Sequence, residues 1–144
     1  MNNSRIYQNS VTILPTTNDA IHLQGSSQNT VRNNSIEGKL HLQPLGNQQT
    51  TKNVLTLNMF ENTITPTEDT GTNNQWQAGI TVFGRTRILG NYYDIYSKNT
   101  QCINGNCCRD DNYDNICDQA YLFTNNQDNN PTRSKHIPSQ QPPT

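Results

Sequence analysis

The sequence has few apolar residues, few charges and no long hydrophobic run. Only 30% of its 144 residues are hydrophobic and 15% are charged, and the formal net charge is −1. No apolar stretch approaches the length of a membrane-spanning helix, so no membrane span is expected. The near-neutral charge offers no basic surface for nucleic acid, and no nucleic-acid-binding motif is present. The low charge also differs from the high charge of fully disordered chains.

Sequence motifs of the common enzyme classes are missing as well. The chain has no phosphate-binding loop, no dinucleotide fingerprint and no Ser-His-Asp order. A glycosidase needs two facing carboxylates, whereas Glu37, Glu61 and Glu68 are scattered along the chain. Arg85 and Arg87 are expected to be solvated rather than catalytic. The sequence therefore favours a non-catalytic protein.

The cysteines and the N-terminus give different indications about the cellular compartment. The N-terminal segment MNNSRIYQNS lacks the apolar core of a signal peptide. Four cysteines cluster in one short segment, which favours disulfides and an oxidising compartment. They are Cys102, Cys107, Cys108 and Cys117. We therefore expect the C-terminal part of a longer exported protein, extracellular or periplasmic.

The spacing of the cysteines leaves the disulfide connectivity open. Adjacent Cys107 and Cys108 are not expected to bond to each other, because the geometry of such a bond is strained. A zinc site made by all four cysteines is the alternative. That site would lack the paired Cys-x2-Cys ligand turns of common zinc folds.

One pattern, apolar-x-x-Asn-x-apolar, recurs along the chain. Its asparagines follow one another at intervals of 25, 28 and 29 residues and are Asn9, Asn34, Asn62 and Asn91. A second phrase, two apolar residues around a polar one, falls between them at Ile21–Leu23, Leu40–Leu42 and Ile80–Val82. Such short strands cannot bury one face alone, but turns stacked about 4.7–4.9 Å apart pair their backbones and close an apolar interior. Equivalent asparagines then form a hydrogen-bonded amide ladder.

The repeat predicts an all-β fold, a parallel β-helix (solenoid) of about four turns. Its last full turn is expected at Gly79–Tyr96, followed by a Cys-rich capping loop over about 97–123 and a final strand at Tyr121–Phe123. Residues 1–123 would thus form one domain. Residues 124–144 are polar and Pro-rich, and they are expected to be disordered. The first turn has no cap, which predicts end-to-end self-association.

The series of repeats resembles the right-handed parallel β-helix of the pectate-lyase-like superfamily, and its ending resembles the periplasmic copper-binding, NosD-like branch. That branch typically ends with N-x-W-x-D-Y and then D-x-D-x-D-G-I-G-D-x-P-Y. This chain has NYYDIY at 91–96 and DDNYDNICDQAY at 110–121. It departs from these motifs at Tyr93, Ile95, Asn112, Asn115, Cys117 and Ala120. The resemblance spans about residues 5–123 and implies a right-handed β-helix and a copper-handling accessory protein.

The acidic run has the spacing of a calcium loop. Calcium takes oxygen ligands from positions 1, 3, 5, 7 and 9 of such a loop, with a sharp turn at position 6. Those positions are filled by Asp110, Asn112, Asp114, the carbonyl of Ile116, and Asp118. Asn115 stands at the turn position, and Tyr121 replaces the bidentate glutamate of position 12. Calcium would therefore bind weakly or be completed from elsewhere; the alternative is a solvated turn whose side chains cap local backbone.

Two histidines occupy the middle of equivalent strand phrases. If the turns stack in register, the rings of His22 and His41 lie about 5 Å apart on one surface. Imidazole suits copper or zinc, and the resemblance points to copper. The alternative is a pair of ordinary surface histidines.

The single tryptophan, Trp76, lies in a polar insertion at Thr65–Gln77. It would either present a flat face to a sugar ring or fold back over the coil to bury its own apolar area. The main hypothesis is a non-catalytic extracellular or periplasmic module that presents a surface to polysaccharide. The alternatives are a fragment of a polysaccharide lyase or hydrolase and, from the resemblance, a NosD-like copper-handling protein.

Overall fold

The computed structural model describes residues 2–99, 107–123 and 126–134 of the chain. These residues form an all-β structure apart from one short helix, α1 (Asp94–Ser97). The first parallel sheet contains β1 (Arg5–Tyr7), β4 (Thr30–Arg32) and β7 (Val54–Thr56). The second contains β2 (Ser10–Thr12), β5 (Ser35–Glu37), β8 (Met59–Phe60) and β12 (Tyr92–Tyr93). The third contains β3 (Asp19–Gln24), β6 (Lys39–Gln43) and β9 (Thr67–Asp69).

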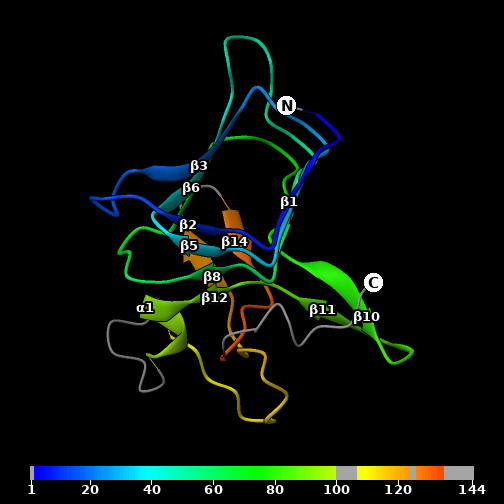
Figure 1. The fold of residues 1–144 in the computed structure, drawn as a ribbon. Helices are drawn as coiled ribbons and strands as arrows, with labels where there is room; N and C mark the ends of the chain where they lie inside the picture. Colours follow the sequence, from blue (N-terminus) through cyan, green and yellow to red (C-terminus); the bar gives the residue numbers. More distant parts are fainter. Residues whose placement is uncertain (1, 100–106, 124–125, 135–144) are drawn as a thin grey trace.

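The chain visits the three sheets in the same order three times. We call each passage a circuit: β1–β3, β4–β6 and β7–β9. Figure 1 shows the strands of the second sheet, β2, β5, β8 and β12, lying one below the other. Strands β1, β2 and β3 are the end strands of their sheets, so the predicted self-association through the first circuit stays a prediction.

Side chains at equivalent positions of successive circuits stack into columns inside the three sheets. In the first sheet Ile6, Val31 and Leu55 are in register. In the second sheet the column is Val11, Ile36, Phe60 and Tyr93. Because each strand alternates inward and outward residues, a short strand needs only one or two apolar side chains to fill the interior. This explains how a chain with 30% hydrophobic residues builds a core.

Asparagines at the corners, buried in all but the first circuit, form two amide ladders along the stack. One runs through Asn9, Asn34, Asn58 and Asn91, and each asparagine donates its backbone N–H and its side-chain amide to Oδ1 of the next. A second ladder runs through Ser4, Asn29, Asn53 and Asn74. The predicted ladder is therefore present, but its third member is Asn58. Asn62 is exposed and lies outside the ladder.

The corners that carry the ladders have left-handed backbone conformations. Gln8, Asn33 and Leu57, which precede the rungs of the first ladder, have φ of 57–58°. Gln28 and Lys52, which precede rungs of the second, also have φ of 58°. Non-glycine residues adopt this region at a cost, and here the buried amide bonds of the following asparagine offset it.

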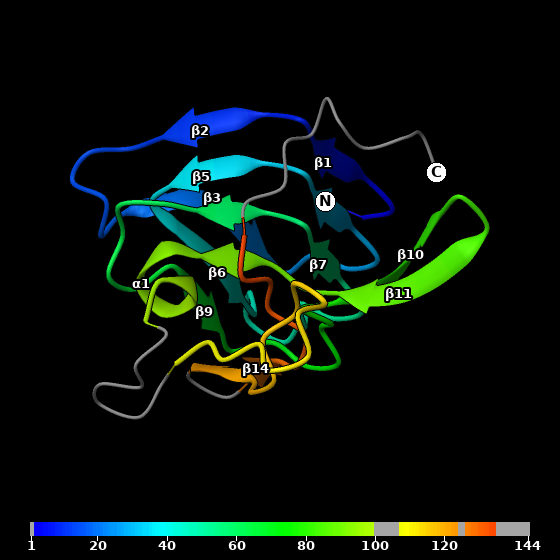
Figure 2. The same cartoon turned by 90° about the horizontal axis from the view of Figure 1, so that it is seen from below.

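The segment predicted to be the last full turn, Gly79–Tyr96, is a hairpin in its first part, whereas Asn91 and β12 in its second part continue the first ladder and the second sheet. β10 (Ala78–Val82) pairs antiparallel with β11 (Arg85–Leu89). The two-residue loop Phe83–Gly84 has positive φ at both residues, which is the geometry that closes a tight hairpin. Figure 2 shows this hairpin projecting from the body of the molecule. Ile80–Val82 is therefore not equivalent to Ile21–Leu23 and Leu40–Leu42; β9 takes that place in the third sheet.

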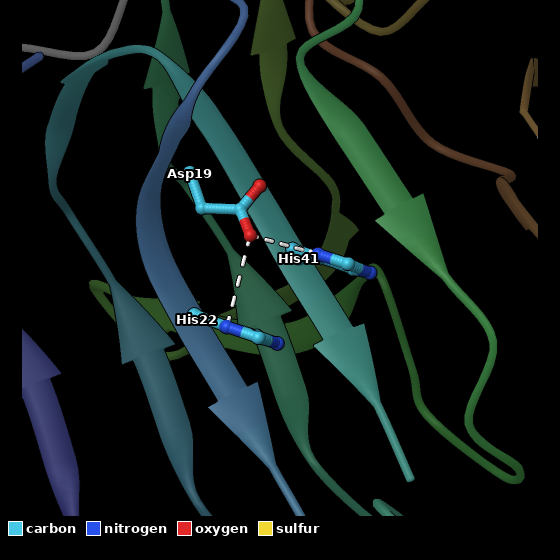
Figure 3. Close-up of side chains that lie close together, drawn as sticks. All are labelled: Asp19, His22 and His41. Carbon is cyan, nitrogen blue, oxygen red and sulfur yellow. Dashed lines mark hydrogen bonds and ion pairs between the residues drawn. The ribbon is translucent and has the colours of Figure 1, made fainter.

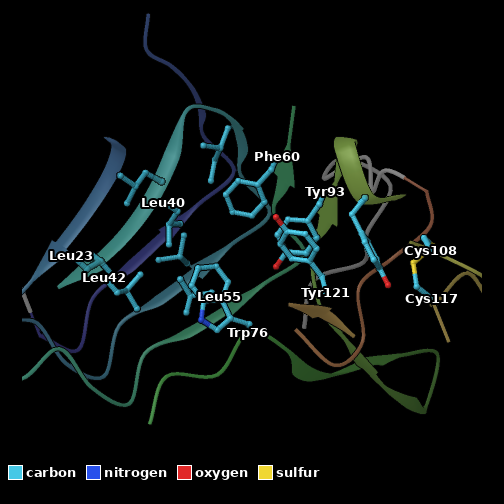
Figure 4. Packing of buried hydrophobic residues seen from close by; sticks show 14 residues of the cluster. Leu23, Leu40, Leu42, Leu55, Phe60, Trp76, Tyr93, Cys108, Cys117 and Tyr121 are labelled. Atoms are coloured by element: carbon cyan, nitrogen blue, oxygen red, sulfur yellow. A yellow bond between two sulfur atoms is a disulfide. The ribbon is translucent and has the colours of Figure 1, made fainter. Parts of the chain in front are cut away.

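The C-terminal part closes the lower end of the stack. β13 (Tyr121–Phe123), predicted as a final strand, pairs antiparallel with β14 (Asn126–Asp128). The ring of Tyr121 stacks on Tyr93 at 4.1 Å, and Tyr93 stacks on Phe60 at 5.2 Å. Figure 4 shows Tyr121 beside Tyr93, with Phe60 of the same column next to them. The closing segment thus extends the core by one layer.

Part of the predicted disordered tail is ordered. Residues 126–134 include β14 and the fully buried side chains of Asp128 and Thr132. They are ordered because Asp128 accepts the hydrogen bonds that the first ladder donates at its end. Residues 135–144 lie outside the described part of the chain.

Candidate metal site

The outer face of the third sheet brings together residues from all three circuits. His22 on β3, His41 on β6 and Glu68 on β9 are paired in register, so their side chains form one row. Alternation along each strand turns these side chains outward, while the flanking apolar residues of β3 and β6 point into the core.

The two imidazole rings are stacked, as the sequence predicted. Their centroids lie 4.6 Å apart and their planes differ by 5°. Figure 3 shows Asp19 beside both rings. Its Oδ2 is 2.9 Å from Nδ1 of His41 and 3.7 Å from Nδ1 of His22. Within the described residues, these three side chains are the one group of three His, Cys, Asp or Glu whose ligand atoms all lie within 4.8 Å of one another.

Asp19 did not stand out in the sequence because of a local irregularity. Residues three apart on a regular strand point to opposite faces, so Asp19 would point away from His22. The register of β3 against β6 shifts between Asp19 and Ile21, and such a bulge re-aims a side chain. The Asp-x-x-His spacing was visible, but the bulge that gives it meaning was not.

Lys39 and Glu68 complete a charged network around the histidines. Lys39 Nζ lies 2.6 Å from Glu68 Oε2 and 3.4 Å from Asp19 Oδ1. Nε2 of His41 is 3.5 Å from Glu68 Oε1, and Nε2 of His22 is 3.2 Å from Gln43 Oε1. The histidines therefore have polar partners at both ring nitrogens.

The network shifts the pKa values of its charged members. Burial acts to raise the pKa of Asp19, but the hydrogen bond and charge of His41, together with Lys39, hold that pKa below its ordinary value. The hydrogen bond with Lys39 lowers the pKa of Glu68. The same bond raises the pKa of Lys39. Both carboxylates are thus ionised at neutral pH, and they outnumber the one ammonium group of the network.

The donor set fits copper(II) or zinc chemically. Two imidazole nitrogens and one carboxylate oxygen are ligands that both metals accept. Both Nδ1 atoms face Asp19. Because the rings are nearly parallel, their in-plane lone pairs do not converge, so a shared ion requires rotation of at least one imidazole.

The acidic run is folded on itself. The carboxylate oxygens of Asp110 accept the backbone N–H groups of Asp114 and Asn115. Asp114 accepts the N–H of Ile116, and Asp118 accepts the N–H of Asp111. Asn112 accepts from Asp114 as well. This is the local capping that the sequence offered as the alternative to calcium, and calcium binding gains no support from it.

Two further features of the run match the sequence. Asn115 has φ of 68°, as its place at the turn predicted. Cys108 and Cys117 form a disulfide across nine residues of sequence, and Cys107 is also disulfide-bonded. Cys102 lies outside the described residues. The expectation that Cys107 and Cys108 do not bond to each other is confirmed, and the disulfide removes the zinc alternative.

Trp76 is a core residue. Its side chain is fully buried, and its Nε1 donates to Oδ2 of Asp69 at 2.9 Å. Phe123 packs edge-on against it with ring centroids 4.8 Å apart. The ring therefore folds back over the coil, the second of the two predicted placements, and presents no face to a sugar.

Arg85 and Arg87 are exposed on β11, and Arg87 donates to the carbonyl oxygen of Asp114.

Comparison with known proteins identifies one family. The family model described as "Periplasmic copper-binding protein (NosD)" matches residues 1–98. This region includes every strand of the three parallel sheets and the cluster of Asp19, His22 and His41, and it ends before the acidic run. Neither the curated proteins nor the solved structures include a match. No helix among the described residues is long and apolar enough to cross a membrane.

Proposed function

The chain belongs to the NosD family of periplasmic copper-binding proteins, and on that premise we propose that it binds copper through Asp19, His22 and His41. It acts as a non-catalytic accessory protein of the periplasm, with copper as its cargo. The single observation that carries the proposal is the stacked histidine pair with a carboxylate within reach of both Nδ1 atoms.

The architecture supports this assignment of roles. We infer that the three circuits are turns of a right-handed parallel β-helix, since each sheet is parallel and the chain visits the sheets in a constant order. In such a solenoid the distance between neighbouring strands is set by backbone hydrogen bonds. Stacked turns therefore place His22 over His41 by construction, and the scaffold holds the two ligands at a constant separation.

Copper(II) titration of the metal-free protein tests the proposal. We expect one copper ion per chain by calorimetry, with two nitrogen ligands in the electron paramagnetic resonance spectrum. The double variant H22A/H41A should abolish this binding, and D19N should weaken it by about tenfold, because a charged oxygen ligand becomes a neutral one.

The third histidine provides a matched control. His136 lies outside the described residues, and H136A should bind copper as the wild type does. Equal copper affinity in the wild type and in H22A/H41A would contradict the proposed site. Since imidazole must be unprotonated to bind a metal, affinity should also fall on acidification.

The carbohydrate hypothesis loses its main support with the burial of Trp76. A glycan array remains its direct test. The alternative of a polysaccharide lyase or hydrolase stays a prediction, and an assay for unsaturated or reducing products on acidic polysaccharides tests it.

A further inference from the structure

The positively charged side chain of Lys39 lies next to the proposed copper ligands. Its Nζ lies between Oδ1 of Asp19 at 3.4 Å and Oε2 of Glu68 at 2.6 Å. The other oxygen of Asp19, Oδ2, faces the two histidines. One carboxylate therefore serves both the lysine and the proposed metal site.

The placement of Lys39 follows from the stacked circuits. Lys39 begins β6 and is in register with Asp19 on β3, and its Nζ donates to Glu68 on β9. Only 19% of its side chain is exposed, so neighbouring residues hold the ammonium group beside the two carboxylates. The lysine is thus a built part of the cluster.

The charges of the cluster decide what a second cation does. Two ionised carboxylates and one ammonium leave a net charge of −1 while the histidines are neutral. A divalent ion bound to Asp19 would lie within a few ångströms of the ammonium. Their repulsion is strong there, because the site is partly buried and its effective dielectric constant is lower than that of water. Copper and the ammonium therefore compete for Asp19.

We propose that Lys39 is a built-in competitor that lowers copper affinity and speeds copper release. The proposal rests on the proposed function. Copper binding displaces the ammonium from Asp19, and Lys39 stays with Glu68, its closer partner. When copper leaves, the ammonium returns and neutralises Asp19. Such an arrangement suits a protein that passes its metal on.

Glu68 takes a positioning role in this scheme. Its Oε1 is 3.5 Å from Nε2 of His41, the ring nitrogen on the opposite side from Asp19. When Nδ1 binds copper, Nε2 carries the proton and donates to Glu68. Such a carboxylate partner orients a histidine ligand and raises its basicity.

The test replaces the charge of Lys39 and measures copper binding. K39M should bind copper(II) at least about tenfold more tightly than the wild type. The release of copper from K39M to an excess of chelator, measured by stopped flow, should be slower than the release from the wild type. K39R keeps the positive charge and should remain close to the wild type. Circular dichroism of each variant confirms that it is folded.

A second lysine offers a matched control. Lys98 pairs with Asp94 at 2.7 Å on α1, and K98M removes one positive charge from the same protein. It should leave copper affinity unchanged. An equal gain in K39M and K98M would overturn the proposal, because the effect would then be one of net charge.

The outcomes separate this proposal from the proposed function. If H22A/H41A abolishes copper binding while K39M matches the wild type in affinity and release rate, Lys39 is no competitor but the copper site stands. If the wild type binds no copper, the proposed function fails and this inference fails with it.

Discussion

The stacked circuits and the segment that closes them hold their buried polar groups in different ways. Within the circuits each buried asparagine accepts from the rung before it and donates to the rung after it. At the closing end both ladders meet a carboxylate: the first ends at Asp128 and the second at Asp69. An amide is self-complementary and can repeat, whereas a carboxylate only accepts. The ladders therefore end where an acidic residue replaces an asparagine.

The two carboxylates are tied together by the last strand. Asn126, at the start of β14, donates to Oδ2 of Asp69 at 2.8 Å. Asp128, two residues further on the same strand, accepts hydrogen bonds from the side-chain amide of Asn91 and from the hydroxyl of Tyr93. One strand of three residues thus ends the first ladder through Asp128 and contacts the end of the second through Asn126. The comparison teaches that the repeat needs many equivalent residues, but its end needs a few specific ones.

The largest effect is expected from breaking a ladder in the middle. N58A removes a buried side chain that donates to Asn91 and to the carbonyl of Val31 and accepts from Asn34. Several buried groups lose their partners at once, so the free energy of unfolding should fall by about 3–5 kcal/mol. Thermal and urea unfolding measure this loss.

The control for this variant is the asparagine that the sequence pattern selected. Asn62 is exposed and has φ of 55°, a conformation that glycine adopts freely. N62G should therefore change stability by less than about 0.5 kcal/mol. Equal losses in N58A and N62G would show that the ladder contributes no more than an exposed corner.

The next effect concerns the end of the first ladder. Burial raises the pKa of Asp128 to about 7, although hydrogen bonds from Asn91, Asn130 and Tyr93 act in the opposite direction. In the unfolded chain the same carboxyl titrates near its ordinary value. Between about pH 4 and 7 the folded protein keeps a proton that the unfolded chain has lost, so stability falls as pH rises. The change should reach a few kcal/mol.

D128N removes this titration. The difference in unfolding free energy between wild type and D128N should therefore shift across pH 4–7 and level off above it.

Asp94 should show the opposite dependence of stability on pH. Burial acts to raise its pKa, but the hydrogen bonds with Lys98 and Tyr92 lower it below its ordinary value. Its contribution is present at neutral pH and is lost in acid. D94N should consequently lose stability relative to the wild type only above about pH 4.

The smallest of the three effects concerns the disulfide of the closing segment. Cys108 and Cys117 close a loop with a sequence separation of nine residues, for which a loss of about 2–3 kcal/mol is expected on C108A/C117A. Hydrogen exchange should show the loss first at β13 and β14. Amides of β4 to β6 should keep their protection, because both cysteines lie in the closing segment and not in the stacked circuits. A uniform loss of protection would mean that the two regions unfold as one unit.

The sequence pattern found the ladder but misplaced one rung. Leu55, Asn58 and Phe60 fit apolar-x-x-Asn-x-apolar as well as Met59, Asn62 and Ile64 do. The choice between them depends on which corner adopts φ near +58°, and Leu57 does so without a glycine to mark it. A chain rich in asparagine offers several registers, and only burial of the amide selects one.

The metal site divides in the same way. The stacking of His22 over His41 followed from strand spacing and the repeated phrase, because parallel strands in register place equivalent side chains about 5 Å apart. The third strand was misassigned to Ile80–Val82, so Glu68 was not placed beside His41. Asp19 and Lys39 were missed because a bulge and an inter-strand register decide where their side chains point.

The order of residues alone determined that this chain is all-β, that it repeats, and that two histidines meet on one surface. These properties depend on periodicity and on the constant spacing of paired strands, which are local. The tertiary structure alone decided which asparagines are rungs, that Trp76 is internal, that β14 contacts the ends of both ladders, and that Lys39 and Glu68 join the histidines. Those outcomes depend on burial and on contacts between residues up to 57 positions apart, where no local pattern distinguishes one polar residue from another.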